Sequence, residues 1–242
     1  MRFAVARLSV AAALCALVAS PLSAQDDPRR DQARADATAA ESARLSPPAI
    51  APEGVLNNPE QMLALDLSSG GRVVIQLRPD VAPQHVERIK TLARQGFYNG
   101  LTFHRVIEGF MAQGGDPQGN GTGGSQLPDL PAEFNGLPHV RGALSMARAE
   151  NPNSANSQFF IMLLPRLTLD RNYTVFGRVV SGMDVIDRVQ RGEPPAHPTR
   201  IVQASVMADQ RPLPPASALS ADALIPPTPA APVATEEAAP GN

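Results

Sequence analysis

Two short runs of alternating apolar residues, separated by the turn sequence SSGG, constrain the fold of this chain more than any other feature. The first run is LALDL (63–67) and the second is RVVIQL (72–77). In both runs every second residue is a large aliphatic one, which is the period of a β-strand with one buried face. Two such runs around a glycine-containing turn predict a β-hairpin.

The residues after the hairpin predict a mainly β domain with two helices. In VAPQHVERIKTLARQGFY, Pro83 suits a first helical turn, Val86, Ile89 and Leu92 form an apolar stripe, and Gly96 ends the helix. A second helix is expected over Met183–Gln190. Further strands are expected at Leu101–Ile107, Phe110–Gln113, Ala143–Ala147, Gln158–Leu163, Thr174–Val180 and Thr199–Ala208. Many short strands and few helices favour a closed antiparallel barrel capped by helices.

The first 24 residues have the order of a secretory signal peptide. Arg2 and Arg7 precede the apolar stretch Leu8–Ala19, and Ala24 offers a small residue for cleavage. The apolar stretch is short for a membrane span. We therefore expect export, most simply to a periplasm, with no membrane span after cleavage. The one cysteine, Cys15, lies inside this signal, and Leu14 before it argues against lipidation.

Composition divides the rest of the chain into three parts. Residues 25–58 are rich in Ala, Asp, Arg and Pro and lack an apolar stripe, which predicts a disordered or weakly helical linker. Residues 209–242 are rich in Pro and Ala, which predicts an extended, disordered tail. The folded domain is therefore expected over residues 59–208.

Several classes of function lack support in the sequence. A formal net charge of −2 without a run of one sign gives no basic face for a nucleic acid. The glycine-rich stretch GGDPQGNGTGGS (114–125) lacks the lysine of a phosphate-binding loop. The four histidines lack metal-ligand spacing, so no metal is expected. Neither Ser145 nor Ser157 lies in a nucleophile elbow, and no pair of carboxylates suggests hydrolysis.

The stretch FHRVIEGFMAQGGD (103–116) places one arginine, Arg105, among several large apolar residues. A charge in such surroundings is paired, reaches solvent past the apolar atoms, or takes part in function. If residues 101–107 form a strand, Arg105 shares a face with Phe103 and Ile107. The pattern alone leaves two interpretations open: a surface arginine that covers apolar atoms, or one that acts on a substrate.

Five motifs together resemble those of the cyclophilin family of peptidyl-prolyl cis-trans isomerases. They are FHRVIEGFMAQGGD, GNGTGG, LSMARA, SQFFIM and YTVFGRV, and they occur in the family's order across residues 62–208. The short connection between GTGG and LSMARA is similar to the compact bacterial members. The resemblance implies a closed eight-stranded antiparallel barrel capped by two α-helices, and isomerisation of X-Pro bonds in proline-containing polypeptide clients.

The resemblance also implies a set of site residues. Arg105 matches the catalytic arginine, and Gln113 matches the polar residue that orients it. The remaining positions would bind the substrate: a proline pocket at Phe110, Met111, Phe160 and Leu169, a backbone-pairing segment at Ala147, Arg148 and Ala149, a groove glutamine at Gln158, and Tyr173 where many members have histidine.

Three positions depart from the pattern of many eukaryotic members. Thr168 stands where they have tryptophan, which predicts a thinner pocket wall and weaker binding of cyclosporin-like ligands. Arg148 replaces an asparagine and adds a charge beside the groove. Tyr173 keeps a planar ring but loses the imidazole.

An isomerase of this kind breaks no covalent bond, so no cofactor, metal or nucleophile is expected. We expect a monomer that acts on X-Pro bonds of exported proteins. A peptide-binding chaperone that uses the same groove without turnover is the alternative. A third possibility is an adaptor whose proline-rich tail recruits a partner, although the tail has no PxxP flanked by basic residues.

Overall fold

The computed structural model describes residue 51 and residues 54–220. The expected signal peptide, most of the expected linker and the end of the expected tail lie outside these residues. Among the helices of the described part, none has the length and apolar character needed to cross a membrane.

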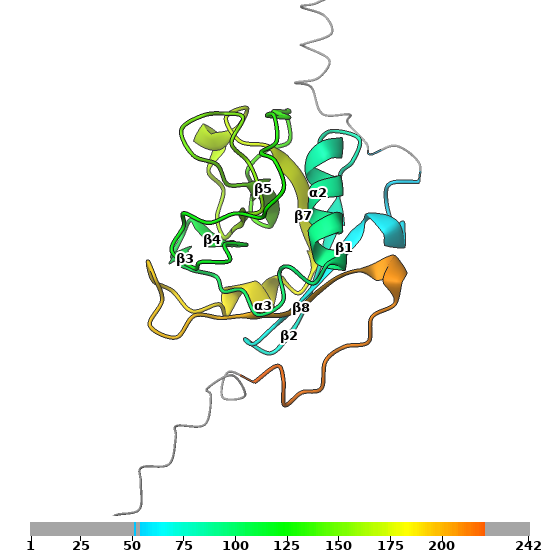
Figure 1. The fold of residues 1–242 in the computed structure, drawn as a ribbon, viewed down its shortest axis with the longest axis vertical. Helices are drawn as coiled ribbons and strands as arrows, with labels where there is room; N and C mark the ends of the chain where they lie inside the picture. Colours follow the sequence, from blue (N-terminus) through cyan, green and yellow to red (C-terminus); the bar gives the residue numbers. More distant parts are fainter. Residues whose placement is uncertain (1–50, 52–53, 221–242) are drawn as a thin grey trace, which may run out of the picture. The chain divides into compact units, whose positions relative to one another are not determined.

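Eight antiparallel strands form one strongly curved sheet in the order β3-β4-β6-β5-β7-β2-β1-β8 (Figure 1). Two α-helices accompany it: α2 (Pro83–Arg94) and α3 (Met183–Asp187). The strands are β1 (Met62–Leu67), β2 (Gly71–Leu77), β3 (Arg105–Ile107), β4 (Met111–Gly114), β5 (Ala143–Met146), β6 (Phe159–Met162), β7 (Val175–Ser181) and β8 (Ile201–Val206).

The expected hairpin is formed by β1 and β2. Its register pairs Leu63 with Ile75 and Leu65 with Val73, so the large aliphatic side chains of both strands lie on one face. Val86, Ile89 and Leu92 of α2 join the same buried cluster. The hairpin and the stripe on α2 thus bury each other, as their two periodicities predict.

The strand β6 is buried on both faces, which explains its continuous apolar sequence. In FFIM (159–162), Phe159 and Ile161 belong to the main core, whereas Phe160 and Met162 belong to a second apolar cluster. Met111 of β4 lies opposite Met162 and joins this second cluster. The second cluster is the platform on which the candidate active site is built.

The expectation of a closed barrel is wrong, because the edge strands β3 and β8 form no ladder with each other. One isolated bridge joins Thr102 to Arg200 across the seam. The backbone of Val106 in β3 instead exchanges hydrogen bonds with Gly192, N to O at 2.8 Å and O to N at 2.9 Å. The loop 190–199 therefore occupies the edge that a closing strand would need, and the sheet stays open.

The break at the start of β3 also separates two side chains that were expected on one face. The backbone N–H of Phe103 donates to Thr199 across the seam at 2.9 Å, and its ring is fully buried in the main core. β3 begins only at Arg105, whose side chain is 44% exposed. Phe103 and Arg105 therefore point into different environments.

The second helix is shorter than expected. α3 ends at Asp187 rather than Gln190, because the backbone N–H groups of Arg188 and Val189 donate to residues three positions earlier instead of four. Val189 remains buried, so the apolar side that suggested a longer helix is real. The boundaries of the other predicted strands differ from the structure by up to four residues.

The paired glycines after β4 are required by close packing. Gly115 has a φ of +85°, and a Cβ atom there would lie 2.5 Å from the carbonyl oxygen of Ser157. A Cβ atom on Gly114 would lie 3.2 Å from the carbonyl oxygen of Thr102. A side chain at Gly115 would therefore force the backbone to move, and one at Gly114 would require small shifts of its neighbours.

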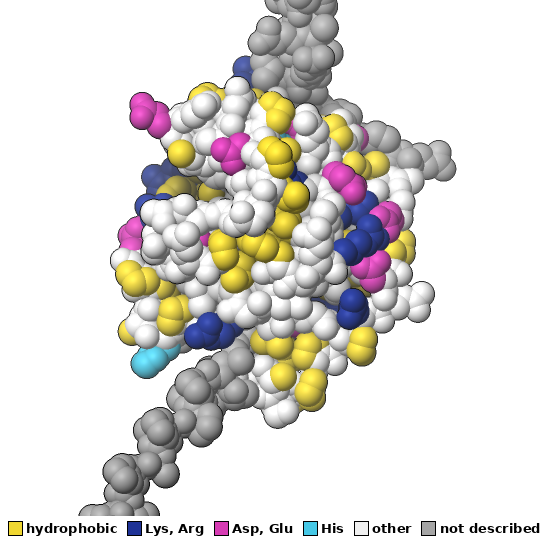
Figure 2. Space-filling model, in the orientation of Figure 1, with side chains coloured by type: hydrophobic (Ala, Val, Ile, Leu, Met, Phe, Trp, Pro, Cys, Tyr) yellow, Lys and Arg dark blue, Asp and Glu magenta, His cyan; other side chains and the backbone are white. Residues whose placement is uncertain are grey.

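Contacts of the domain extend past both of its expected ends. Asn57 donates to Gln76 of β2, and Gln203 of β8 donates to the carbonyl of Pro212. Leu219 is 7% exposed. Glu60 pairs with Lys90 and Arg94 of α2. Arg94 also pairs with Asp209. Acidic and basic side chains therefore alternate on the surface beside α2 (Figure 2).

Candidate active site

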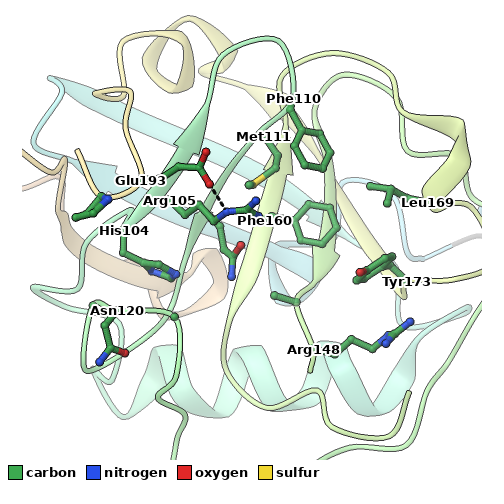
Figure 3. A pocket seen from close by; sticks show the side chains of 15 residues that line it. His104, Arg105, Phe110, Met111, Asn120, Arg148, Phe160, Leu169, Tyr173 and Glu193 are labelled. Atoms are coloured by element: carbon green, nitrogen blue, oxygen red, sulfur yellow. Dashed lines mark hydrogen bonds and ion pairs between the residues drawn. The ribbon is translucent and has the colours of Figure 1, made fainter. Parts of the chain in front are cut away.

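A cavity of about 590 Å³ opens on the second apolar cluster. Its lining comes from β3, β4 and β6, from the segment after β5, and from three further connections, around residues 119–121, 169–173 and 193–194 (Figure 3). The lining residues are His104, Arg105, Phe110, Met111, Gln113, Gly119, Asn120, Gly121, Ala147, Arg148, Phe160, Leu169, Tyr173, Glu193 and Pro194.

The apolar part of the cavity consists of side chains that the sequence analysis assigned to a proline pocket. Met111 and Phe160 are buried beneath it, and Phe110 lies beside them, directly before β4. Leu169, in the short helix η2 (Leu167–Leu169), and Tyr173 form the opposite side (Figure 3). The ring of Tyr173 meets that of Phe160 edge to face, with centroids 5.8 Å apart. This arrangement gives a rigid apolar surface for a small ring.

Arg105 lies beside this surface with its guanidinium partly free. Its Nε donates to Oε2 of Glu193 at 2.6 Å, and both side chains are about half exposed. Within residues 54–220 the two Nη groups have no hydrogen-bond acceptor. A guanidinium has five N–H donors, so four remain for a bound molecule.

Gln113 lies beside Arg105 on the neighbouring strand but does not hold it. The two residues are register partners in β3 and β4, yet Nε2 of Gln113 donates to Oε1 of Gln158 at 2.9 Å. Gln158 in turn donates to the carbonyls of Gly121 and Gly123. The orienting contact that the resemblance assigned to Gln113 is made by Glu193, and the two glutamines secure the glycine-rich loop.

A second cavity, of about 550 Å³, continues from the first. The two share Gln113, Gly121, Ala147 and Arg148, and the second also reaches Ala149 and Gln158. The site is therefore an elongated groove, which suits an extended peptide better than a compact ligand. All residues that the sequence analysis assigned to the site line one or both of these cavities.

The segment 147–149 has one free backbone donor. The N–H groups of Ala147 and Ala149 donate inside the protein, to the carbonyl of Gln158 and to Oγ of Ser154. The N–H of Arg148 has no acceptor in the described part of the chain. Its side chain lies over the ring of Tyr173, with Cζ 4.7 Å from the centroid, and donates to carbonyl oxygens of residues 149, 150 and 172.

Thr168, expected to leave one wall thin, is exposed and lines neither cavity. The apolar wall at this place is made by Leu169 and Tyr173. The neighbouring Arg166 lies over the ring of Phe110, with Cζ 5.1 Å from the centroid. A charged group thus covers part of the pocket rim from outside.

Six lining residues were not predicted from the sequence: Glu193, Pro194, His104, Gly119, Asn120 and Gly121. Glu193 and Pro194 lie in the loop 190–199, far from Arg105 along the chain, and no periodic pattern links them to it. His104 had a signal, since it precedes Arg105 in the same motif. It is 5% exposed, and neither ring nitrogen has a partner within the described residues. Burial lowers the pKa of His104, so its ring is neutral at neutral pH.

A buried polar group supports the pocket from below. The ring of His139 stacks on that of Phe160, with centroids 6.0 Å apart. Its Nδ1 lies 2.8 Å from Asp170 and its Nε2 lies 3.1 Å from Oγ of Ser145. These three residue types occur together in hydrolases, but Ser145 is fully buried and donates to the carbonyl of Thr174. The group is therefore a support for Phe160 and not a nucleophile.

The glycine-rich loop is organised around its own acid. Asp116 accepts from the backbone N–H groups of Gln118, Asn120 and Gly121. Burial raises the pKa of Asp116, but these N–H groups together hold it below its ordinary value. Donors that a phosphate would need are thus already used. Within the described residues no group of three His, Cys, Asp or Glu is placed to hold a metal ion.

Comparisons with known proteins agree with this geometry. The sequence pattern of the family "Cyclophilin type peptidyl-prolyl cis-trans isomerase/CLD" matches residues 62–206. A "Probable peptidyl-prolyl cis-trans isomerase" of Brucella suis is 50% identical over 170 residues, covering 64% of this chain and 86% of that protein. "Peptidyl-prolyl cis-trans isomerase B" of Bacillus subtilis is 44% identical over 129 residues, covering 52% of this chain and 89% of that protein.

A solved structure shares the fold. The crystal structure of cyclophilin AquaCyp293 from Hirschia baltica superposes with a TM-score of 0.58 at 31% identity, covering 64% of this chain and 76% of that chain. The family pattern spans every strand of the sheet and every residue of the groove that lies in the sheet. The chain therefore belongs to the cyclophilin-type peptidyl-prolyl cis-trans isomerases.

Proposed function

We propose that this chain accelerates cis-trans rotation about X-Pro bonds in polypeptides, with Arg105 as the catalytic residue. The observation that carries the proposal is the position of Arg105. Its free Nη donors lie beside an apolar surface of Phe110, Met111 and Phe160, and this surface is continuous with a groove long enough for a peptide. A proline ring and the amide beside it need those two environments side by side.

The chemistry requires only stabilisation of a twisted amide. Rotation about the bond costs about 18–20 kcal/mol because resonance is lost, and the nitrogen gains a lone pair as the bond twists. A guanidinium directed at this nitrogen, or at the displaced carbonyl oxygen, binds the twisted form more strongly than the planar one. A charge-assisted hydrogen bond of about 1.5–3 kcal/mol gives one to two powers of ten in rate.

The remaining rate acceleration would come from orientation. The apolar surface would hold the proline ring while the carbonyl on the other side of the bond turns. Pairing with the free N–H of Arg148 would fix the peptide backbone in the groove, beside Ala147 and Ala149. Gln113 and Gln158 would keep the glycine-rich loop against the peptide. No cofactor or metal takes part in this mechanism.

We further propose that the substrates are exported polypeptides and that the protein acts as a monomer, in a periplasm. Support comes from the order of basic, apolar and small residues in the first 24 positions. The single cysteine lies in this segment, so the remainder of the chain tolerates an oxidising compartment.

A chaperone that binds peptides in the same groove without turnover is the second candidate. Its support is the length of the groove, which exceeds what one proline needs. The free Nη donors of Arg105 favour the isomerase, because binding alone gives no reason to leave these donors without acceptors beside apolar side chains.

Exchange between the cis and trans forms of a short Ala-Pro-Phe peptide, measured by magnetisation-transfer NMR, separates the two. We expect the purified protein to accelerate exchange and Arg105→Ala to lose most of the acceleration while its circular dichroism spectrum stays unchanged. If both proteins bind the peptide and neither accelerates exchange, the groove is a binding site and the catalytic assignment of Arg105 is wrong.

A further inference from the structure

We propose that Glu193 forms a subsite for a cationic side chain next to the substrate proline, and that it also positions Arg105. The inference rests on the proposed function, since it names the peptides that the same groove prefers. Glu193 lies at the rim of the first cavity, beyond Arg105 when viewed from the apolar surface (Figure 3). Peptides with lysine or arginine beside the proline would be preferred over peptides with acidic residues there.

One oxygen of the Glu193 carboxylate remains available. Oε2 accepts from Nε of Arg105 at 2.6 Å, whereas Oε1 has no donor within the described part of the chain. A carboxylate has about four acceptor positions, so it can bind a second cation without releasing the first. The side chain of Glu193 is 50% exposed, so a flanking side chain of a bound peptide can reach it.

The backbone holds Glu193 at this place. The neighbouring Gly192 exchanges two hydrogen bonds with Val106, which itself adjoins Arg105. A Cβ atom on Gly192 would lie 2.6 Å from Cα of Pro195, so the turn is tightly packed. The N–H of Gln190 donates to Oγ1 of Thr199 across the base of the loop. Glu193 is therefore placed against Arg105 by a fixed turn.

The two ends of the first cavity differ in charge, since one has a cation without a carboxylate partner and the other has the ion pair of Glu193 with Arg105. Arg148, at the far end, donates to carbonyl oxygens and pairs with no carboxylate among residues 54–220. Near Glu193, the other charges pair with each other, since Arg191 binds Glu108 at 2.6 Å. A peptide with a basic residue at the Glu193 end thus meets complementary charge, and an acidic residue there meets a carboxylate.

The binding of Nε to Glu193 also fixes the direction of the guanidinium. Because Nε is held, the plane of the guanidinium turns its Nη groups toward the apolar surface. Loss of the carboxylate would let Arg105 rotate, so it would slow turnover of every peptide. Loss of the charge alone would change the preference among peptides. Positioning of Arg105 and binding of a cationic side chain therefore affect different measurements, the overall rate and the preference among peptides.

The test compares Glu193→Gln with Glu108→Gln, a matched control that removes an acid of the same region that lines neither cavity. Exchange is measured by magnetisation-transfer NMR for peptides with Lys, Gln or Glu directly after the proline, and again with these residues directly before it. In at least one series we expect the parent protein to act on the Lys peptide about three- to fivefold faster than on the Glu peptide. Glu193→Gln should bring this ratio close to one, and Glu108→Gln should leave it unchanged.

Two further readouts complete the design. The ratio should decrease in 0.5 M NaCl, because exposed charges are screened at that ionic strength. Glu193→Ala should lower kcat for the neutral Gln peptide more than Glu193→Gln does. An unchanged Lys-to-Glu ratio in Glu193→Gln for both series would overturn the subsite. Absence of any acceleration of the Gln peptide by the parent protein would instead overturn the proposed function itself.

Discussion

The side chains of Gln113 and Gln158 are joined by a hydrogen bond, with Nε2 of Gln113 2.9 Å from Oε1 of Gln158. Nε2 of Gln158 in turn donates to the carbonyl oxygens of Gly121 and Gly123, at 3.0 and 2.8 Å. One wall of the groove is therefore a glycine-rich loop that two amide side chains connect to the sheet, in addition to the hydrogen bonds that the loop makes with its own Asp116.

Replacing Gln158 by alanine should weaken substrate binding more than it slows the chemical step. The substitution frees the loop 119–124 but leaves Arg105 and its contact with Glu193 in place. We expect KM for a neutral X-Pro peptide to rise about three- to tenfold, with kcat changed less than twofold, since each lost hydrogen bond contributes about 0.5–1.5 kcal/mol. Steady-state NMR exchange over a range of peptide concentrations measures both. A drop confined to kcat would contradict this role.

Arg105→Lys should lose most of the activity although it keeps the positive charge. A lysine ammonium cannot bind Glu193 and also direct a planar pair of donors at a twisted amide. We expect kcat/KM to fall at least tenfold while the melting temperature stays within about 2 °C of that of the parent protein, because Arg105 is half exposed. Activity close to that of the parent protein would show that charge alone suffices.

Ser145→Ala should destabilise the fold but should not abolish activity, because Ser145 does not serve as a nucleophile. The hydroxyl group contacts Nε2 of His139 and donates to the carbonyl of Thr174, and both partners are buried. We expect the free energy of unfolding to fall by about 1–3 kcal/mol, as leaving buried polar groups unpaired costs this much. Urea unfolding gives the value. Isomerase activity should remain measurable at 15 °C, and its complete loss in a folded variant would contradict a supporting role.

Gly115→Ala should destabilise the protein more than a substitution at an ordinary loop glycine. The residue has a positive φ and lacks space for a Cβ atom beside Ser157. We expect a loss of at least about 1–3 kcal/mol in the free energy of unfolding. Gly100→Ala is the matched control, because Gly100 has the same φ of +85° but open space around it. Equal losses in the two variants would show that conformation alone, and not packing, sets the cost.

Stability should fall in mild acid because of two buried histidines. Burial lowers the pKa of His104 and of His139, although Asp116 and Asp170 oppose the effect. As pH falls through about 6.5, the unfolded chain binds protons on both rings and the folded chain does not. The free energy of unfolding is therefore highest above pH 6.5 and decreases as the pH is lowered from 7.5 to 5.5.

Urea unfolding at these two pH values checks the slope. His139→Gln and His104→Gln should each reduce the difference between the two free energies. The neighbouring Arg94 lowers the pKa of Glu60 to about 2. Carboxylates of this kind lose their contribution to stability only at lower pH, between about 4.5 and 2. A slope that neither histidine variant changes would assign the pH dependence to other groups.

Local patterns predicted the elements of this fold well where one periodicity dominates. The alternation in β1 and β2 and the stripe on α2 identified a hairpin and a helix, because burial of one face leaves a direct trace in the sequence. The fully buried β6 was recognisable as a strand, but the division of its side chains between two apolar clusters was not. A continuous apolar run does not say which residues face which side.

Closure of the sheet could not be predicted from such patterns. It depends on whether β3 and β8 meet, and the backbone of Val106 pairs with Gly192 instead. Backbone hydrogen bonds carry no side-chain signature. The contact of Glu193 with Arg105 could not be predicted either, because Glu193 lies in an irregular loop and the two residues are 88 positions apart. The groove residues were assigned through motifs shared with a family, and Glu193 lies outside those motifs.

The loop 190–199 is attached at two places: Gly192 pairs with Val106 at the edge of the sheet, and Glu193 binds Arg105. This loop lies outside all eight strands, whereas Met111, Gln113 and Phe160 of the groove belong to strands of the sheet. Changes in client preference are thus separable from changes in the scaffold. To change the preference of the protein for acidic or basic clients, an engineer should therefore keep Gly192 and vary positions 193–198 of this loop.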